Sequence, residues 1–173
     1  MLQVGLFYGS TTGNTEDVAD ALMDAFNALV PDAIETSLNI ADVEVSALAD
    51  YDLLILGVST WDIGEAQYDW QDAIDNMDGI DLSGRKVAIF GLGDQDGYPD
   101  SYQDAIGILG KKVRELGAEL VGFTSTEGHD FNESQGVEDD KFMGLALDED
   151  NQDDLSEERI SAWVKQLQEE FGL

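Results

Sequence analysis

An almost unbroken apolar run at residues 53–58, LLILGV, constrains the fold of this chain more than any other segment. The run shows no alternation of polar and apolar positions, so a strand formed here has both of its faces buried. Strands of this kind are typical of parallel sheets that carry helices on both sides. The segment therefore predicts the central strand of such a sheet.

Shorter apolar runs on either side of this segment alternate with segments of helical periodicity, in which apolar residues repeat every three or four positions. The predicted strands are residues 2–8, 34–39, 53–58, 86–90 and 119–123, and the predicted helices are residues 15–30, 68–77, 101–116 and 156–171. Five strands interleaved with helices predict an α/β fold with a doubly wound five-stranded parallel sheet. Right-handed crossovers would place helices on both faces, as a three-layer α/β/α sandwich.

The segment 124–142 interrupts this alternation. It carries an acidic loop and leads into another strand-like run, residues 142–147, FMGLAL. We interpret it as a long loop that leaves the last strand and returns to it, rather than as a second domain. A chain of 173 residues fits one domain with a sizeable core, so residues 1–173 are predicted to form a single domain.

Glycine and hydroxyl residues fill the segment 9–15, GSTTGNT, between the first predicted strand and the first predicted helix. Backbone N–H groups, the helix dipole and hydroxyls together favour an anion such as phosphate at a helix N-terminus. The segment lacks the lysine of a nucleoside-triphosphate loop, and residues 1–84 contain seventeen Asp and Glu but no Lys, Arg or His. A phosphate bound here is held by neutral donors, which suits a monophosphate that is never released. The alternative is an ordinary capping turn.

Two further loops follow the third and fourth predicted strands and reach the same edge of the sheet. The loop 59–67 carries Trp61, and the loop 91–100 carries Tyr98. Each aromatic taken alone is best explained as a core or rim residue. Two aromatics on facing loops above a phosphate loop, however, can hold a flat conjugated ring between them. The three loops together indicate flavin mononucleotide (FMN).

The formal net charge of −30 restricts the partners of the chain. Nucleic acids and anionic membranes are polyanions and are therefore not expected as partners. A protein with a basic docking face is expected instead, because opposite charges speed its encounter. The sequence has no cysteine, no secretory leader and no apolar run long enough to span a membrane, so a cytoplasmic location is predicted.

The segments 9–15, 59–65 (STWDIGE) and 91–98 (GLGDQDGY) resemble those of flavodoxins, and the match spans the whole chain. The interrupted last strand with residues 145–152 (LALDEDNQ) resembles the long-chain subclass. The resemblance implies tightly but noncovalently bound FMN, with Trp61 and Tyr98 on either side of the ring and Tyr98 as the closer stack. The FMN contacts that it implies are Ser10, Thr11, Thr12, Gly13, Asn14, Thr15, Thr60, Trp61, Asp62, Ile63, Gly64, Leu92, Gly93, Asp94, Tyr98, Asp100 and Asp148.

The activity implied by the resemblance is that of a low-potential one-electron carrier without substrate turnover of its own. Such a carrier shuttles electrons between a reductase and acceptor proteins. The implied partners are redox proteins with basic docking faces, similar to ferredoxin/flavodoxin–NADP reductase. The chain is expected to act as a monomer.

Three residues depart from the usual family pattern: Ser59 stands where proline is common, Leu92 where threonine is common, and Asp62 where asparagine is common. Ser59 is expected to loosen its loop. Neither Asp62 nor Ile63 is glycine, so a positive φ in this turn is expected to be unfavourable. Flavodoxins stabilise the one-electron-reduced flavin through the peptide at this turn, and we expect weaker stabilisation here than in relatives with glycine.

An FMN-dependent NAD(P)H or quinone reductase is the main alternative. Such an enzyme needs a second pocket over the flavin, and the sequence shows no insertion dedicated to one. Gly91 and Gly93 match only part of a dinucleotide fingerprint, because the third glycine comes one residue late at Gly97 and the motif follows the fourth strand. A flavin-free receiver module shares the strand order, but the segment 9–13 lacks the carboxylates that it needs.

No catalytic residue and no metal site are predicted. Asp148 and Asp150 begin like a calcium-binding loop, but Asp153 and Arg159 stand where that loop requires glycine and glutamate. His129 has no cysteine or serine partner in the sequence pattern and is assigned to a surface loop.

Overall fold

The computed structural model describes residues 3–173 and is built on a central parallel sheet. Its strand order is β2, β1, β3, β5, followed by β6 and β10, which both pair with β5. The strands are β1 (Val4–Tyr8), β2 (Ser37–Asn39), β3 (Leu53–Trp61), β5 (Lys86–Leu92), β6 (Glu119–Val121) and β10 (Leu145–Leu147). This order confirms the doubly wound fold. Leu2, which belongs to the first predicted strand, lies outside the described residues.

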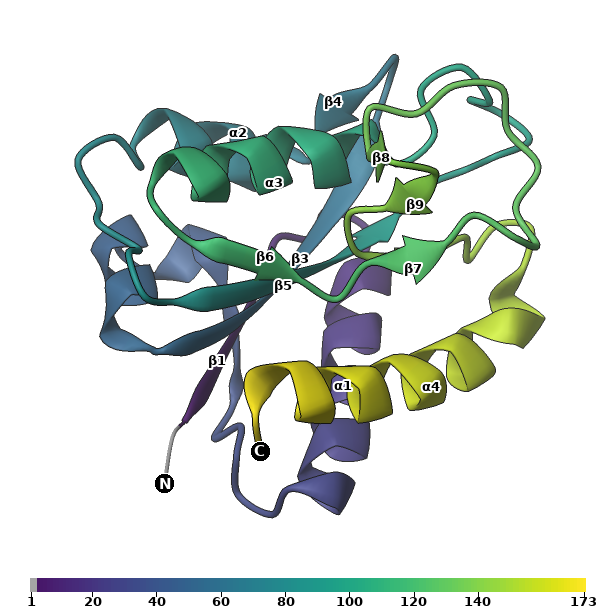
Figure 1. Ribbon diagram of the computed structural model, residues 1–173. Coiled ribbons are helices and arrows are strands. Elements are labelled where there is room, and N and C mark those ends of the chain that lie inside the picture. Colours follow the sequence, from purple (N-terminus) through teal and green to yellow (C-terminus); the bar gives the residue numbers. More distant parts are fainter. Residues whose placement is uncertain (1–2) are drawn as a thin grey trace.

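Helices cover both faces of the sheet and give the three predicted layers (Figure 1). α1 (Asn14–Leu29) and α4 (Asp153–Phe171) lie on one face, and α2 (Tyr68–Asp75) and α3 (Asp104–Glu115) lie on the other. Two short 3-10 helices, η1 (Ile40–Asp42) and η2 (Val45–Asp50), connect β2 to β3. None of the helices within residues 3–173 combines the length and the apolar character that a membrane span requires.

The apolar run in β3 is buried because its side chains alternate between two core clusters. Leu53 and Ile55 belong to the cluster formed with α1 and α4, whereas Leu54 and Leu56 belong to the cluster formed with α2 and α3. None of the four is more than 4% exposed. This burial is the one expected for a central parallel strand. The buried strand gives the loops at the carboxyl edge of the sheet a rigid base.

Two separate segments fill the last strand position of the sheet. β6 pairs with the first three residues of β5 and β10 with the last three, so the interruption predicted for the last strand is confirmed. The chain between them, which we call the excursion, spans residues 122–144 rather than 124–142. It forms a small antiparallel sheet of β7 (Thr124–Ser125), β9 (Lys141–Phe142) and β8 (Val137–Glu138), visible beside the main sheet in Figure 1.

Several element boundaries differ from the sequence prediction, and three of them lie near the loops at the carboxyl edge of the sheet. β3 continues through Trp61 and pairs with β4 (Glu65–Ala66), so much of the predicted loop 59–67 is an antiparallel hairpin. α3 begins at Asp104, because Gln103 adopts a left-handed conformation with φ 60. α4 begins at Asp153, where two carboxylates in the first turn complement the helix dipole.

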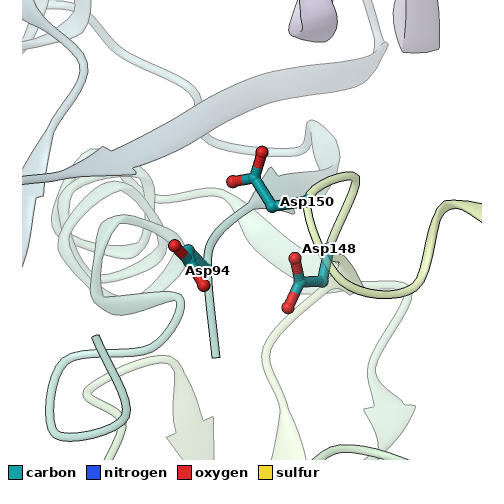
Figure 2. A group of neighbouring side chains, drawn as sticks. All are labelled: Asp94, Asp148 and Asp150. Atoms are coloured by element: carbon teal, nitrogen blue, oxygen red, sulfur yellow. The ribbon is translucent and has the colours of Figure 1, made fainter. Parts of the chain in front are cut away.

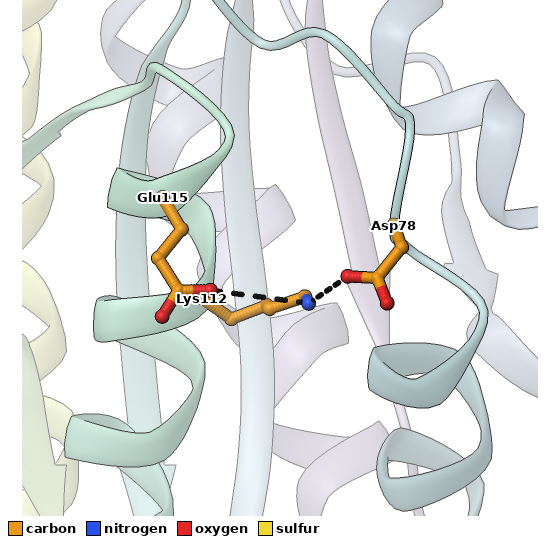
Figure 3. Close-up of polar contacts among 3 residues, drawn as sticks. All are labelled: Asp78, Lys112 and Glu115. Atoms are coloured by element: carbon orange, nitrogen blue, oxygen red, sulfur yellow. Dashed lines mark hydrogen bonds and ion pairs between the residues drawn. The ribbon is translucent and has the colours of Figure 1, made fainter.

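Some of the few cations of the chain form ion pairs on the surface of α3. Lys112 lies between Asp78, which follows α2, and Glu115, whose Oε2 is 3.9 Å from Lys112 Nζ (Figure 3). Arg114 Nη1 donates to Glu138 Oε2 at 2.7 Å and connects the helix to β8. Exposed pairs of this kind contribute at most about 1 kcal/mol each. These cations are engaged on α3 and form no anion-binding patch.

Candidate functional site

A pocket of about 380 Å³ opens at the carboxyl edge of the sheet, among the loops that follow β1, β3, β5 and β10. Ligands of doubly wound sheets bind at this edge, and the volume is typical of small-molecule sites. The pocket is lined by Thr11, Thr12, Asn14, Thr15, Ser59, Thr60, Trp61, Asp62, Leu92, Gly93, Asp94, Tyr98, Glu149 and Asp150. Two larger grooves, of about 570 and 750 Å³, lie against α2 and between α1 and α4, and neither has an aromatic lining residue.

Most residues that the sequence predicted as FMN contacts line this pocket. Those that do not are Ser10, Gly13, Ile63, Gly64, Asp100 and Asp148. Ser59, Glu149 and Asp150 line it without having been predicted as FMN contacts. The two acidic residues reach it because the chain turns back after β10, where Asn151 N donates to Asp148 Oδ1. Their signal in the sequence is the acidic run that directly follows the last strand, at the edge where the other loops meet.

The loop after β1, residues 9–13, which we call the anion loop, and the first turn of α1 present unpaired donors to the pocket. Gly13 is the N-cap of α1, and Asp17 N donates to Gly13 O at 3.0 Å. Among the backbone N–H groups here, those of Thr11, Thr12, Asn14 and Thr15, all of which line the pocket, have no acceptor within residues 3–173. No Lys, Arg or His lines the pocket. Free N–H groups, hydroxyls and the helix dipole therefore form a site suited to an anion without a cationic side chain.

Two hydroxyls near the pocket accept hydrogen bonds from the protein itself. Gly13 N donates to Ser10 Oγ at 3.0 Å, which closes the loop from within. Ala105 N donates to Thr60 Oγ1 at 3.0 Å, which binds this end of β3 to the start of α3. Ser10 thus shapes the anion loop rather than lining the pocket, and the Thr60 hydroxyl fixes its own strand against a helix.

Trp61 and Tyr98 reach the pocket from two different loops. Their side chains are 37% and 48% exposed, unlike Trp70 and Trp163, which are buried. Trp61 Nε1 donates to Ser59 Oγ at 2.8 Å, so the hydroxyl of Ser59 holds the indole. The exposed faces of the two aromatics offer surfaces on which a flat ring can stack.

The turn between β3 and β4 contains a non-glycine residue in the left-handed region. Asp62 has φ 49, and Gly64 has φ 89. Asp62 thus adopts a positive φ although it is not glycine, and aspartate tolerates this conformation better than most other residues. Ile63 lies at the tip of the turn and is 87% exposed, so it projects into solvent rather than into the pocket.

Carboxylates gather on one side of the pocket. One oxygen from each of Asp94, Asp148 and Asp150 lies within 4.8 Å of the others (Figure 2). Amide groups offset part of this charge, because Gln95 Nε2 donates to Asp148 Oδ2 at 2.8 Å and Asn151 Nδ2 donates to both Asp94 and Asp148. Burial and the charges of Asp94 and Asp148 raise the pKa of Asp150. This side of the pocket is therefore electronegative.

Asp148 and Asp100, which the sequence predicts near the ring and the ribityl chain, do not line the pocket, and both form hydrogen bonds within the protein. Asp148 is fully buried, and Gln95 N donates to its Oδ2 at 3.0 Å. Asp100 is exposed and accepts a hydrogen bond from Asn132 Nδ2 at 2.8 Å. The role of Asp148 is to hold the loop after β5, which carries Tyr98 to the pocket.

His129 lies in a loop, as the sequence predicts, but its side chain is half-buried rather than fully exposed. Its Nδ1 lies 2.9 Å from Tyr102 Oη, and its ring packs edge-on against Phe142 with centroids 5.0 Å apart. Burial, together with the charge of Arg159, lowers the pKa of His129 to about 4. The side chain is neutral near pH 7 and packs in an aromatic cluster with Tyr102 and Phe142.

The strand order and a ligand-sized pocket at its switch point define a doubly wound α/β protein of flavodoxin-like topology. A family model described as Flavodoxin matches residues 6–163. A flavodoxin from Nostoc sp. is 49% identical over 171 residues, which cover 99% of this chain and 98% of the relative. Flavodoxin 1 of Escherichia coli is 42% identical over 174 residues, which cover 100% of this chain and 97% of the relative. The chain belongs to the flavodoxin family.

A solved structure extends this similarity to three dimensions. The crystal structure of Fusobacterium nucleatum flavodoxin bound to flavin mononucleotide matches with a TM-score of 0.90 at 33% identity. The match covers 98% of this chain and 99% of that chain. The length of 173 residues and the excursion within the last strand agree with the long-chain subclass.

Proposed function

We propose that this chain binds FMN tightly but noncovalently and carries single electrons between redox proteins. The observation that carries the proposal is the pocket, which combines unpaired donors at one end with two exposed aromatic faces at the other. The family membership and the FMN in the Fusobacterium nucleatum flavodoxin point the same way. Bound FMN would supply the redox chemistry, and the residues of the chain would bind, orient and shield it.

The anion loop fits the phosphate of FMN. The free N–H groups and the hydroxyls of Thr11, Thr12 and Thr15 can all donate to phosphate oxygens, and the N-terminal end of α1 favours the negative charge. Because no cation contributes, affinity here depends on the number and the direction of neutral donors. Ser10 and Gly13 act in this proposal by fixing the shape of the loop.

The aromatic end of the pocket fits the isoalloxazine ring. Trp61 and Tyr98 would lie on its two faces, and the backbone of residues 60–64 and 92–94 would line its edge. Leu92 is only 6% exposed and adds an apolar contact at that edge. Stacking excludes water from the ring faces and fixes the orientation of the flavin. The carboxylates on the rim would disfavour added negative charge on the ring and so lower its reduction potential.

Partner proteins are proposed to dock over the mouth of this pocket. Ile63 at the hairpin tip is 87% exposed, and Tyr68 at the start of α2 is 72% exposed. The chain that carries these exposed side chains has a formal net charge of −30. A redox protein with a basic docking face, similar to ferredoxin/flavodoxin–NADP reductase, would be steered toward such a surface. In this proposal residues 1–173 act as one domain, as a cytoplasmic monomer without substrate turnover.

A flavin titration followed by reduction tests the proposal. Apo-protein should quench FMN fluorescence with a Kd below about 1 μM. NADPH alone should leave the bound FMN oxidised, whereas NADPH with a trace of a ferredoxin–NADP reductase should reduce it. Failure to bind FMN at micromolar concentrations would contradict the cofactor. Rapid reduction by NADPH alone would contradict the carrier role and favour an FMN-dependent reductase.

A further inference from the structure

Gln67 connects the anion loop to the loop that carries Trp61. It follows β4 directly, forms the N-cap of α2 and is only 1% exposed. Its backbone N donates to Ser59 O at 2.8 Å, which holds it to the end of β3 where Trp61 emerges. Its side chain reaches the opposite way, to the loop after β1.

The amide group of Gln67 has a partner for both of its polar atoms. Nε2 donates to Thr11 Oγ1 at 3.1 Å and to Asp69 Oδ2 at 2.9 Å, while Oε1 accepts a longer hydrogen bond from Trp70 N at 3.4 Å. Trp70 N requires an acceptor and the carboxylate of Asp69 requires a donor, so both contacts are satisfied by the same orientation of the Gln67 amide. Thr11 therefore receives a hydrogen bond from Gln67 and does not give one to it.

The backbone at Gly9 permits this arrangement. A Cβ atom at that position would fall well inside van der Waals contact with Gln67 Oε1 and would also meet the ring of Trp70. Glycine here lets the buried amide lie against the start of the anion loop. The position of the Gln67 side chain is thus fixed by the loop, by α2 and by β4 together.

The direction of this hydrogen bond determines what Thr11 can offer a ligand. A hydroxyl has one hydrogen and two acceptor lone pairs. Because Gln67 occupies a lone pair, the hydrogen of the Thr11 hydroxyl is left for the pocket that Thr11 lines. No Lys, Arg or His lines the pocket, so no cationic side chain could replace the Thr11 hydroxyl if its hydrogen were turned away from a bound anion.

We infer that Gln67 is a positioning residue for phosphate recognition: it holds the Thr11 hydroxyl as a donor toward the phosphate of the flavin. The inference rests on the proposed function, because it assumes that the anion loop binds the phosphate of FMN. An amide is suited to this role where a carboxylate is not. A carboxylate would accept the Thr11 hydrogen, turn it away from the pocket and add negative charge beside the phosphate.

The test compares the affinities for FMN and riboflavin, which share the ring system but differ in the phosphate. Gln67→Glu reverses the hydrogen bond with little change in shape, and Gln67→Met removes the donor without adding charge. For Gln67→Glu we expect FMN affinity to fall about tenfold or more, and for Gln67→Met by a few-fold. Riboflavin affinity should stay within about twofold of wild type for both variants, since the ring contacts are untouched. Fluorescence titration of the apo-proteins measures both constants.

Gln71→Glu is the matched control. Gln71 lies one turn further along α2, is exposed, and donates from Nε2 to Ala66 O at 2.8 Å. The substitution makes the same charge change in the same helix without contact to the anion loop. The ratio of FMN to riboflavin affinity should therefore remain close to that of wild type.

A double-mutant cycle with Thr11→Val separates positioning from general stability. Once the hydroxyl is gone, Gln67→Met should cause no further loss of FMN selectivity, because it acts only through Thr11. Equal losses for FMN and riboflavin in the Gln67 variants would show a merely structural role and overturn the inference. Unchanged FMN selectivity in Gln67→Glu would overturn it as well. Wild-type protein without any preference for FMN over riboflavin would instead defeat the phosphate site in the proposed function.

Discussion

At the scale of single residues, Ser59 controls the orientation of Trp61. Its hydroxyl accepts the indole N–H at 2.8 Å, and the indole is otherwise 37% exposed. We predict that Ser59→Ala lowers FMN affinity about 3- to 10-fold, because the ring of Trp61 must then be ordered on binding. The stability of the apo-protein should hardly change, since the bond lies at the surface.

The measurement is an FMN titration together with the fluorescence anisotropy of the tryptophans. Ser59→Thr keeps the hydroxyl and serves as the control, with an affinity close to wild type. Equal affinities for wild type, Ser59→Ala and Ser59→Thr would show that the hydrogen bond does not orient the indole.

His129 gives the stability of the chain a specific dependence on pH. Burial and the nearby charge of Arg159 lower its pKa from the ordinary 6.5 to about 4, with Asp148 opposing part of the shift. The unfolded chain therefore takes up a proton at higher pH than the folded chain does. The stability contributed by the neutral side chain is complete above pH 6.5, falls as the pH drops toward 4, and levels off below that.

We predict that His129→Gln removes this part of the acid destabilisation. After allowance for the partial exposure of the ring, the contribution is about 1–2 kcal/mol. Urea unfolding of wild type and variant between pH 7 and pH 4 measures it as the difference between the two profiles, because the carboxylates titrate alike in both. Profiles that run parallel across this range would contradict the assignment.

At the scale of elements, the excursion packs on α3 through a close backbone approach. A Cβ atom at Gly107, in the interior of α3, would collide with the backbone oxygen of Gln135. Glycine inside a helix costs about 1 kcal/mol relative to alanine, so this contact explains why it occurs there. Thr124 Oγ1, which donates to Gly144 O at 2.6 Å, fastens the excursion where it rejoins the sheet.

We predict that Gly107→Ala destabilises the protein by about 1–3 kcal/mol, because the clash outweighs the gain in helix propensity. Gly110→Ala is the matched control in the same helix, since a Cβ there meets only the ends of flexible side chains. Its stability should lie within about 1 kcal/mol of wild type. Urea unfolding and amide exchange in residues 122–144 measure the effect. Equal stabilities for the two variants would rule out the close approach.

Periodicity predicted best the elements whose own apolar pattern shows which of their faces are buried. The sequence of β3 is almost entirely apolar because both faces of the strand are buried. The sequence of α1 is amphipathic because only one face of the helix is buried. The two-residue strands β4, β7, β8 and β9 are defined by their pairing partners, so no local pattern marks them. The burial of His129 likewise depends on an aromatic cluster assembled from distant segments.

The same distinction holds for the pocket. Its aromatic and hydroxyl residues were predicted because they lie at the ends of strands that the sequence reveals. Glu149 and Asp150 were missed because their approach depends on the turn after β10. The burial of Asp148 beside Gln95 depends on how two loops meet, which no local pattern of the sequence marks. Side-chain direction within a loop is a tertiary property that a single sequence does not display.

At the scale of the whole molecule, charge is distributed so that the pocket lies in a strongly negative field. The net charge is −30, and Asp62, Asp94, Glu149 and Asp150 are among the lining residues. Electrons added to a bound flavin therefore meet repulsion from near and distant carboxylates. A carboxylate about 10 Å from the ring contributes about 0.5–1.5 kcal/mol, which corresponds to tens of millivolts.

We predict that the potential of the second flavin reduction, which leaves a negative charge on the ring, rises by tens of millivolts between low and high salt, because salt screens this repulsion. Asp150→Asn should raise the potential at low salt and weaken its salt dependence. Glu169→Gln is the control, because it removes the same charge far from the pocket. Glu169 lies near the end of α4, at the opposite edge of the sheet, where Lys86 Nζ donates to Glu170 O. Spectroelectrochemical titration at two ionic strengths measures all three proteins. A potential that is flat with salt in wild type, or equal shifts in the two variants, would show that local carboxylates do not set the potential.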